Sequence, residues 1–281
     1  MKKTMFIGLI VFSLILLIIV ITLGVNYIMF VPKSIEVDHN DDFPNVCIYS
    51  CDGIKTNLNK IKKEYTFVFY LSSSCSGCLY KLPEIKQIKD VFSSEQIKFI
   101  LIWEDKIPIK KVNRYNIDVR DNYSLNDKVS LSGSKPTVFL IDKQNKISFI
   151  SYEYDTLINK LFDMSKKEDL VKRGIETLQK NLDFNLSESK NARPKLIFFS
   201  TEGCESCNIY YKKAFELAKN KSIQIIKYSD IEQNDDEVCT DYGKIYKRIF
   251  DISSYPTCML IDNNRIISKF TEFLELDVAL K

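Results

Sequence analysis

One order of features occurs twice in this chain, and it constrains the fold more than any other property of the sequence. Each copy begins with a short apolar run, at 65–71 (Tyr-Thr-Phe-Val-Phe-Tyr-Leu) and at 195–199 (Lys-Leu-Ile-Phe-Phe), which predicts a buried strand. A short polar turn and a Cys-x-x-Cys motif follow each run. The two motifs are Cys75 with Cys78 and Cys204 with Cys207. Eight cysteines placed at random would give only about 0.2 such motifs, so finding two is informative.

The elements expected after each motif repeat as well. Apolar residues at helical spacing predict a helix, and a short β-type run predicts a further strand. These elements are helices over 80–92 and 209–219 and strands over 97–103 and 223–228.

A proline-led hairpin then closes the repeat. Lys135-Pro136-Thr137 opens an apolar run that ends at Asp142, and Tyr255-Pro256-Thr257 opens one that ends at Asp262. A polar turn and a second β-type run follow each of them, which predicts a β-hairpin. The second runs are 147–151 and 266–270.

The length of 281 residues suits two compact domains of about 100 to 150 residues each. We expect an α/β fold with an N-terminal segment 1–33, a first domain over 34–182, a polar linker over 183–194 and a second domain over 195–281. The first domain should close with a long or doubled helix over 155–182. It also has a front extension over 46–58, in which Asp52-Gly53 is a hairpin signal that the second domain lacks.

Both copies resemble the thioredoxin superfamily in this order of strand, Cys-x-x-Cys at a helix start, strand, helix and Pro-Thr hairpin. The resemblance implies two three-layer α/β domains, a thiol-disulfide oxidoreductase activity and cis peptide bonds at Pro136 and Pro256, which would face the cysteine pairs. The segment 46–83 is similar to membrane-anchored TlpA/ResA-like reductases, including a helix-kinking proline at Pro83. The second domain is more similar to a minimal thioredoxin or glutaredoxin-like domain.

Some positions depart from the patterns of these families. The reductases usually carry an acidic residue three positions after the second cysteine, and this chain has Lys81 there. The buried aspartate of cytoplasmic thioredoxins is replaced by Phe69 in the first domain and Phe198 in the second.

The chemistry expected of the two motifs is disulfide exchange. The partial positive charge at a helix N-terminus favours a thiolate there, and the thiolate is the attacking species. The first cysteine of each pair, Cys75 or Cys204, should attack, and the second, Cys78 or Cys207, should resolve the mixed disulfide. Glu205 between the second pair should disfavour its thiolate. Electrons should then flow from Cys204/Cys207 to Cys75/Cys78, although Lys212 and Lys213 would act against this.

Several alternatives remain open at this stage. The pairs could be inert disulfides, one domain could be a peptide-binding or scaffold module, and the serines before Cys75 faintly resemble a thiol peroxidase site. Zinc is disfavoured because the two motifs lie 125 residues apart and His39 is the only histidine, so neither metal nor cofactor is expected. The remaining cysteines are Cys47, Cys51, Cys239 and Cys258. Cys47 and Cys51 would pair only if their strand bends, and Cys239 and Cys258 are equally compatible with a disulfide or two buried thiols.

The first thirty residues predict a membrane anchor. Met5 to Val31 contains no charge and is long enough to cross a hydrocarbon layer of roughly 30 Å, and no Ala-x-Ala-like cleavage site follows it. Because Lys2 and Lys3 precede this run, the N-terminus should be cytoplasmic and both domains extracytoplasmic.

The expected partners follow from that location and from the charge. They are exported thiol or disulfide proteins or peptides and a membrane or extracytoplasmic redox partner. A balance of 40 Lys and Arg against 37 Asp and Glu does not indicate a nucleic-acid surface.

Overall fold

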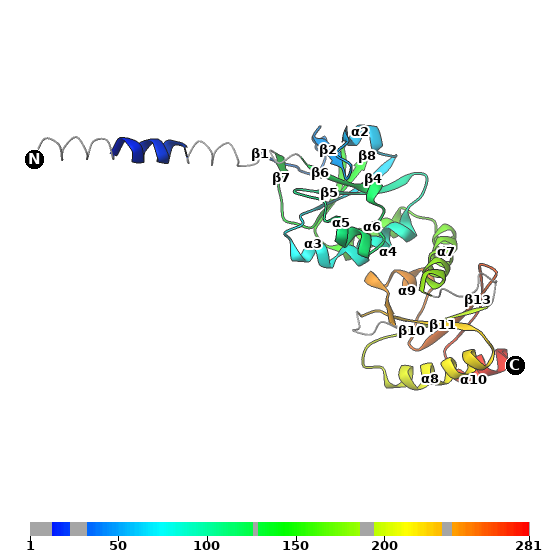
Figure 1. Ribbon diagram of the computed structural model, residues 1–281. Coiled ribbons are helices and arrows are strands. Elements are labelled where there is room, and N and C mark those ends of the chain that lie inside the picture. Colours follow the sequence, from blue (N-terminus) through cyan, green and yellow to red (C-terminus); the bar gives the residue numbers. More distant parts are fainter. Residues whose placement is uncertain (1–12, 23–32, 126–128, 186–193, 232–237, 281) are drawn as a thin grey trace, which may run out of the picture.

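The computed structural model describes residues 13–22, 33–125, 129–185, 194–231 and 238–280. These residues include two sheets, with helix α7 (Lys167–Asn185) between them (Figure 1). Domain one contains the seven-stranded sheet and domain two the five-stranded sheet. The expected linker, 183–194, begins inside α7, and 186–193 lies outside the described residues.

The seven-stranded sheet has the order β3-β2-β6-β5-β4-β8-β9. Its strands are β2 (Cys47–Ser50), β3 (Lys55–Asn57), β4 (Tyr65–Leu71), β5 (Ile97–Trp103), β6 (Asn122–Leu125), β8 (Thr137–Asp142) and β9 (Ile147–Ser151). The central strand β4 runs parallel to β5 and antiparallel to β8. The predicted strands, the front hairpin with its turn at Gly53 and the Pro-Thr hairpin are confirmed. A separate parallel pair joins β1 (Lys33–Ile35) to β7 (Val129–Leu131).

The helices of domain one are α2 (Leu58–Ile61), α3 (Ser76–Tyr80), α4 (Leu82–Phe92), α5 (Ile109–Arg114), the 3-10 helix η1 (Val119–Asp121) and α6 (Tyr154–Asp163). The helix expected over 80–92 is confirmed as α4, and the kink expected at Pro83 is a break at Lys81 that separates α3 from α4. Pro83 explains this break, since proline is accommodated in the first turn of a helix but not in its interior. The final helix of the domain is doubled, as α6 and α7.

The two faces of this sheet are covered differently. Phe67, Phe69 and Leu71 of β4 pack with the buried sides of α4 and α6. Val68 and Tyr70 point to the opposite face, where Phe43, Val46 and Leu58 from the chain before β4 complete a second core. The layer on this second face is formed by the front extension and the four-residue α2, not by long helices.

Domain two has the sheet order β12-β11-β10-β13-β14. Its elements are β10 (Lys195–Ser200), α8 (Glu205–Asn220), β11 (Gln224–Ser229), β12 (Val238–Thr240), the 3-10 helix η2 (Tyr242–Lys244), α9 (Ile245–Ile249), β13 (Thr257–Asp262), β14 (Arg265–Phe270) and α10 (Phe273–Ala279). One face of the sheet packs on α8 and α10, and the other packs on α9 and α7. This domain has the expected three layers.

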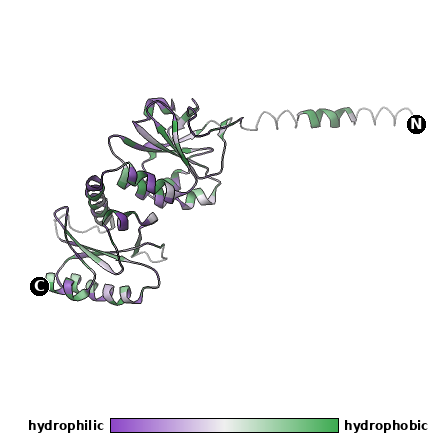
Figure 2. Ribbon diagram, turned by 180° about the vertical axis from the view of Figure 1, so that it is seen from behind, coloured by the Kyte–Doolittle hydropathy of each residue, from purple (hydrophilic) through white to green (hydrophobic). Residues whose placement is uncertain are grey.

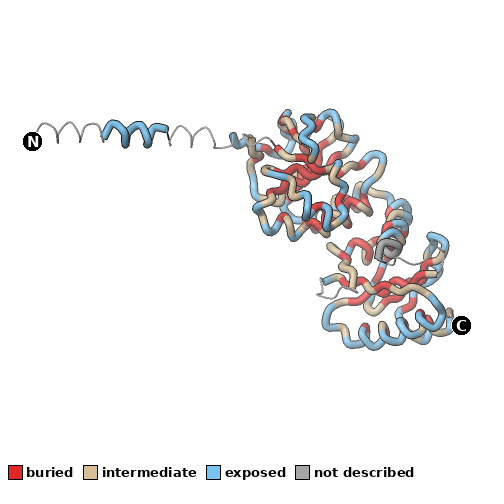
Figure 3. Tube along the Cα trace, in the orientation of Figure 1, coloured by how far each residue is buried: buried red, intermediate tan, exposed pale blue. Residues whose placement is uncertain are grey.

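Helix α7 also packs on α4, so its two sides belong to different domains. As a result, buried residues of both domains form one continuous core. Figure 3 shows buried residues, in red, in both domains. Two glycines permit the close approach. A Cβ at Gly174 of α7 would lie 3.0 Å from the ring of Phe250, and one at Gly243 of η2 would lie 2.1 Å from Cδ1 of Ile158 in α6.

Buried hydrogen bonds join the two domains at this junction. The carboxylate of Asp241 is buried and accepts a hydrogen bond from the side-chain amide of Gln87 in α4, at 3.1 Å. It also accepts from the backbone N–H groups of Tyr246 and Lys247. The Gln87 carbonyl oxygen accepts from the N–H of Tyr242 at 2.8 Å. The Gln87 side chain thus forms two hydrogen bonds with domain two, one as donor and one as acceptor. Together they fix the position of η2 relative to α4.

The N-terminal helix is described over 13–22 only. Its large apolar side chains are exposed, and Figure 2 shows this helix as uniformly hydrophobic. Among the described residues, no helix combines the length and the apolar character needed to cross a membrane.

Candidate active sites

Cys75 and Cys78 lie where β4 turns into α3. Cys75 is the N-cap of α3, and its sulfur accepts a hydrogen bond from the N–H of Cys78 at 3.1 Å. Cys75 is half-buried, whereas Cys78 is completely buried, and both are free thiols. A sulfur held by a helix N–H is stabilised as a thiolate. The more accessible cysteine is therefore also the one that the helix supports as a nucleophile.

A carboxylate organises the turn that precedes Cys75. Asp105, just beyond the end of β5, accepts hydrogen bonds from the N–H of Ser73 at 2.8 Å and from its hydroxyl at 2.7 Å. Burial opposes ionisation of Asp105, but these hydrogen bonds prevail and lower its pKa. The Ser72 carbonyl in turn accepts from the N–H of Cys75. The turn is fixed, and with it the position of the nucleophile.

The Lys135–Pro136 peptide bond is cis and lies beside Cys75. The Cys75 thiol donates to the carbonyl oxygen of Lys135 at a sulfur–oxygen distance of 3.7 Å. The ammonium group of Lys135 lies 2.9 Å from Glu104 and 5.2 Å from the ring centroid of Tyr70. Glu104 also accepts from the hydroxyls of Tyr70 and Ser130. A cation thus stands next to the dithiol, held in place by a fully engaged carboxylate.

The electrostatics separate the two thiols of this site. Burial raises the pKa of Cys78 to about 12, with a further contribution from the Cys75 thiol, while Lys135 acts in the opposite direction. Cys78 is therefore protonated at rest. Behind it, Tyr154 is buried, its hydroxyl has no hydrogen-bond partner among the described residues, and burial raises its pKa well above 10. Lys81 lies over the Tyr154 ring and pairs with the buried Glu84 at 2.6 Å.

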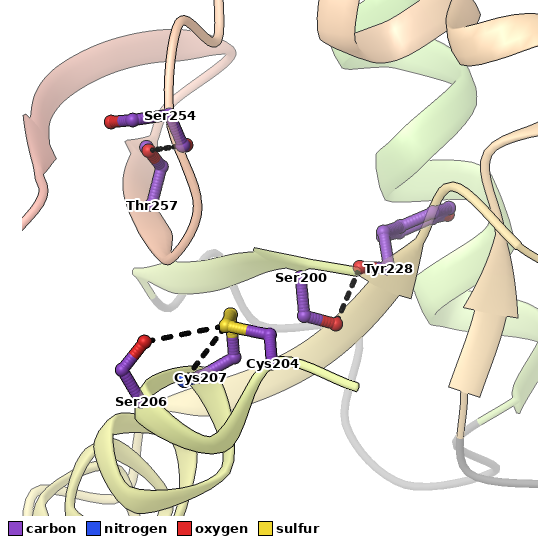
Figure 4. Close-up of a disulfide and its surroundings, with 7 residues drawn as sticks. All are labelled: Ser200, Cys204, Ser206, Cys207, Tyr228, Ser254 and Thr257. Atoms are coloured by element: carbon purple, nitrogen blue, oxygen red, sulfur yellow. Dashed lines mark hydrogen bonds between the residues drawn. A yellow bond between two sulfur atoms is a disulfide. The ribbon is translucent and has the colours of Figure 1, made fainter. Parts of the chain in front are cut away.

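In domain two, Cys204 and Cys207 form a disulfide at the start of α8. Cys204 is the N-cap, and its sulfur accepts from the N–H of Cys207 at 3.1 Å. Cys204 is half-buried and Cys207 is buried, as in the first pair. Figure 4 shows Ser254 and Thr257 on the loop across from the disulfide. The Tyr255–Pro256 bond in that loop is cis.

The residue before the proline differs between the domains. Tyr255 replaces Lys135, and Asp230, just beyond the end of β11, takes the place that Glu104 has in domain one. Lys247 lies over the ring of Tyr255, 4.3 Å from its centroid. The residue before the second cis-proline therefore carries no charge.

The two sheets and their helices share one topology, which fits a thioredoxin-like fold. In each, a central strand runs into the Cys-x-x-Cys helix, pairs in parallel with the strand after that helix, and pairs antiparallel with a hairpin that begins at a cis-proline. This topology follows from the strand pairings of this chain.

Solved structures resemble parts of the chain. A thioredoxin-like protein from Bacteroides caccae has 14% sequence identity and a TM-score of 0.38, with 45% of this chain and 50% of that chain covered. A thiol:disulfide interchange protein from Bacteroides sp. has 18% identity and a TM-score of 0.39, covering 44% and 88%. A peroxiredoxin-like protein from Aquifex aeolicus has 15% identity and a TM-score of 0.38, covering 47% and 90%. No protein-family model and no curated protein sequence matches the chain.

The structure places all six predicted site residues at two sites, as Cys75, Cys78 and Pro136 in domain one and Cys204, Cys207 and Pro256 in domain two. Their catalytic roles stay predictions. Cys47, Cys51, Cys239 and Cys258 are free thiols. Two strands, β11 and β10, separate the strands of Cys239 and Cys258, a distance of roughly 14 Å, so the disulfide considered between them is excluded.

Sequence reasoning missed Glu104, Asp105, Lys135, Tyr154 and Asp230. A signal for the acidic residues was present. Each follows a predicted strand parallel to the strand that leads into a Cys-x-x-Cys motif, and the carboxyl ends of parallel strands share one edge of a sheet. No comparable signal marks Tyr154. Within the described ranges, no three His, Cys, Asp or Glu side chains are grouped so that they could hold a metal ion.

Proposed function

We propose that this chain is a thiol-disulfide oxidoreductase with two redox-active Cys-x-x-Cys pairs that exchanges disulfides with exported proteins or peptides. One observation carries the proposal. In each domain, the sulfur of a half-buried N-cap cysteine accepts a helix N–H, with a buried second cysteine one turn further on and a cis-proline loop across from it. This arrangement supports a thiolate and keeps a second thiol ready to resolve the intermediate.

The exchange at domain one takes two steps. The Cys75 thiolate attacks a client disulfide, forming a Cys75–client bond and releasing one client thiolate, which takes up a proton. Cys78 then loses its proton and attacks the Cys75 sulfur, forming the Cys75–Cys78 disulfide and releasing the second client thiol. Two electrons have passed to the client. Because Cys78 is protonated at rest, the first attack belongs to Cys75.

Domain two then reduces domain one. The Cys204/Cys207 dithiol gives two electrons and two protons to the Cys75–Cys78 disulfide, becomes a disulfide itself, and is reduced again by a separate membrane or extracytoplasmic partner. The different surroundings of the pairs support this direction. Lys135, which is paired with Glu104, precedes the cis-proline in domain one, whereas in domain two that position is the uncharged Tyr255 and Glu205 lies within the cysteine motif. A better stabilised thiolate favours the reduced form and raises the reduction potential.

The N-terminal segment serves as a membrane anchor in this proposal, with both domains outside the cytoplasm. The uncharged run from Met5 to Val31 and the exposed apolar side chains over 13–22 support it. Carbonate extraction and protease treatment of intact cells would test it. We expect the chain to stay with the membrane and both domains to be digested from outside. Release by carbonate, or full protection, would contradict the anchor.

An insulin-reduction assay on the full chain in detergent, with dithiothreitol as electron donor, tests the activity. The parent should accelerate insulin reduction above the dithiothreitol rate, and a chain with both Cys75→Ser and Cys204→Ser should not. A parent no faster than dithiothreitol, or a fully active double variant, would contradict the proposal. Hydrogen peroxide consumption, measured in parallel, would reveal a peroxidase instead.

A further inference from the structure

A cavity lies at the junction of the domains, and none of the four cysteines of the two pairs lines it. Its volume is about 790 Å³, within the range of small-ligand sites, which often occur at domain interfaces. Asp155 and Asn159 of α6 line it from domain one, and Lys244, Lys247 and Arg248 line it from domain two. Its wall continues through 251–253, the stretch that leads to the cis-proline loop of domain two.

Asp230 contributes the most unusual group in this cavity. Its side chain is only 7% exposed, and its Oδ1 is buried without a hydrogen-bond partner among the described residues. Its Oδ2 lies 3.6 Å from the ammonium of Lys244. A buried carboxylate oxygen without a donor is destabilising, so a ligand that brings an N–H group to Oδ1 is favoured there.

The corresponding acid of domain one shows that this arrangement is specific to domain two. Glu104 occupies the same place after its strand, and its carboxylate accepts from Tyr70 and Ser130 and pairs with Lys135. Both oxygens of the Glu104 carboxylate therefore already have partners. The Asp230 carboxylate interacts with the side chains of Lys244 and Tyr255, but its Oδ1 has no hydrogen-bond partner among the described residues, and Asp230 lines the cavity.

Positive charge lies in the same cavity. Arg248 is held against the ring of Phe162, at 3.9 Å, and donates to Asn159 at 2.9 Å, so it joins the two domains. The ammonium of Lys247 lies over the Tyr255 ring and forms no ion pair within the described part of the chain. The cavity therefore presents an acceptor at Asp230 and a cation at Lys247.

We propose that this cavity binds a short peptide through its free termini, with the α-ammonium group donating to Asp230 and the α-carboxylate pairing with Lys247. The volume accommodates a peptide of a few residues, and neither charge pairing requires the cysteines. Because the walls come from both domains, the bound peptide holds the junction closed. The proposal does not rest on the exchange activity proposed above, and its test does not use that activity.

Isothermal titration calorimetry on the full chain in detergent tests the proposal, with trialanine as the probe. N-acetylated trialanine and trialanine amide each lack one terminal charge. We expect trialanine to bind saturably, each blocked peptide to bind at least tenfold more weakly, and Asp230→Asn to weaken trialanine at least tenfold. Asp230→Asn should not weaken the N-acetylated peptide further, because that peptide brings no ammonium group.

Two further variants keep the test decisive. Lys247→Gln should weaken trialanine but leave trialanine amide unchanged, and it removes no buried group, so folding is not at risk. Asp262→Asn, which removes an equal charge outside the cavity, should leave trialanine binding as in the parent. No heat of binding for trialanine, equal binding of all three peptides, or loss of binding in Asp262→Asn as large as in Asp230→Asn would overturn the proposal.

Discussion

The two domains place the same three groups, two cysteines and a cis-proline, in different electrostatic surroundings. In domain one, Lys135 stands before the proline and is held by Glu104. In domain two, the same position is Tyr255, and the nearby acid is the incompletely partnered Asp230. From this difference we expect the shared backbone arrangement to provide the attacking sulfur in both domains and the side chains at the sheet edge to make the two reduction potentials differ.

The largest effect is expected where the shared chemistry is broken. Cys75→Ser and Cys204→Ser remove the attacking sulfur, so each should abolish exchange at its own domain. Cys78→Ser and Cys207→Ser keep attack but remove resolution, so they should trap mixed disulfides with clients. Mass spectrometry after acid quenching measures the trapped species. Equal trapping by all four variants would show that the roles of first and second cysteine are not distinct.

The next effect concerns the junction, which determines whether the domains act as a docked pair. Gly243→Ala adds a Cβ 2.1 Å from Ile158 at a positive φ, so it should destabilise the docked state by about 1 to 3 kcal/mol. Hydrogen exchange of α4 and η2 should rise. Gly53→Ala is the matched control, because Gly53 also has a positive φ but has nothing within 4 Å of its Cβ position. If both variants lost the same amount of stability, the loss would come from backbone strain at a positive φ and not from the contact with Ile158.

A smaller effect is expected from the charge that distinguishes the two sites. Lys135→Gln should slow the attack of Cys75 on a small disulfide by about three- to tenfold, because the thiolate loses a nearby cation. Stopped-flow measurement of Cys75 alkylation and exchange checks this. Lys143→Gln, an exposed lysine on the hairpin turn, serves as control and should leave the rate unchanged. An unchanged rate in Lys135→Gln would remove the electrostatic explanation for the difference between domains.

A further effect is a pH dependence of stability that belongs to the junction. Burial raises the pKa of Asp241 to about 6, and hydrogen bonds from Lys247, Tyr246 and Gln87 oppose this only partly. Because the pKa of the folded state exceeds that of the unfolded state, the contribution is full below about pH 4 and is lost as pH rises through 6. Urea unfolding at several pH values should therefore show stability falling across this window, with a shallower fall in Asp241→Asn. Parallel curves for parent and variant would exclude Asp241 as the source.

Local sequence patterns predicted the strands and placed each Cys-x-x-Cys motif at a helix start, because spacing along the chain specifies them, whereas the cis-prolines were implied by the resemblance to the thioredoxin superfamily. The surroundings of the cysteines were not predicted. Ser73 and Asp105 lie 32 residues apart, and Gln87 and Asp241 lie 154 apart, so these contacts depend on the packed fold. Helix α7 was expected to close one domain only. In the structure, α7 packs on both α4 and α9. This packing depends on how the two domains are arranged, and the spacing of apolar residues along the sequence does not reveal that arrangement.

The central claim is that domain one holds the more oxidising pair, and the reduction potential of each pair tests it most directly. The full chain is equilibrated in thiol-disulfide buffers of graded ratio, quenched with acid and alkylated, and mass spectrometry quantifies each pair in its own peptide. We predict a potential for Cys75/Cys78 that is higher than that of Cys204/Cys207 by at least about 30 mV, a tenfold difference in equilibrium constant. A lower potential for Cys75/Cys78, or equal potentials, would contradict electron flow from domain two to domain one.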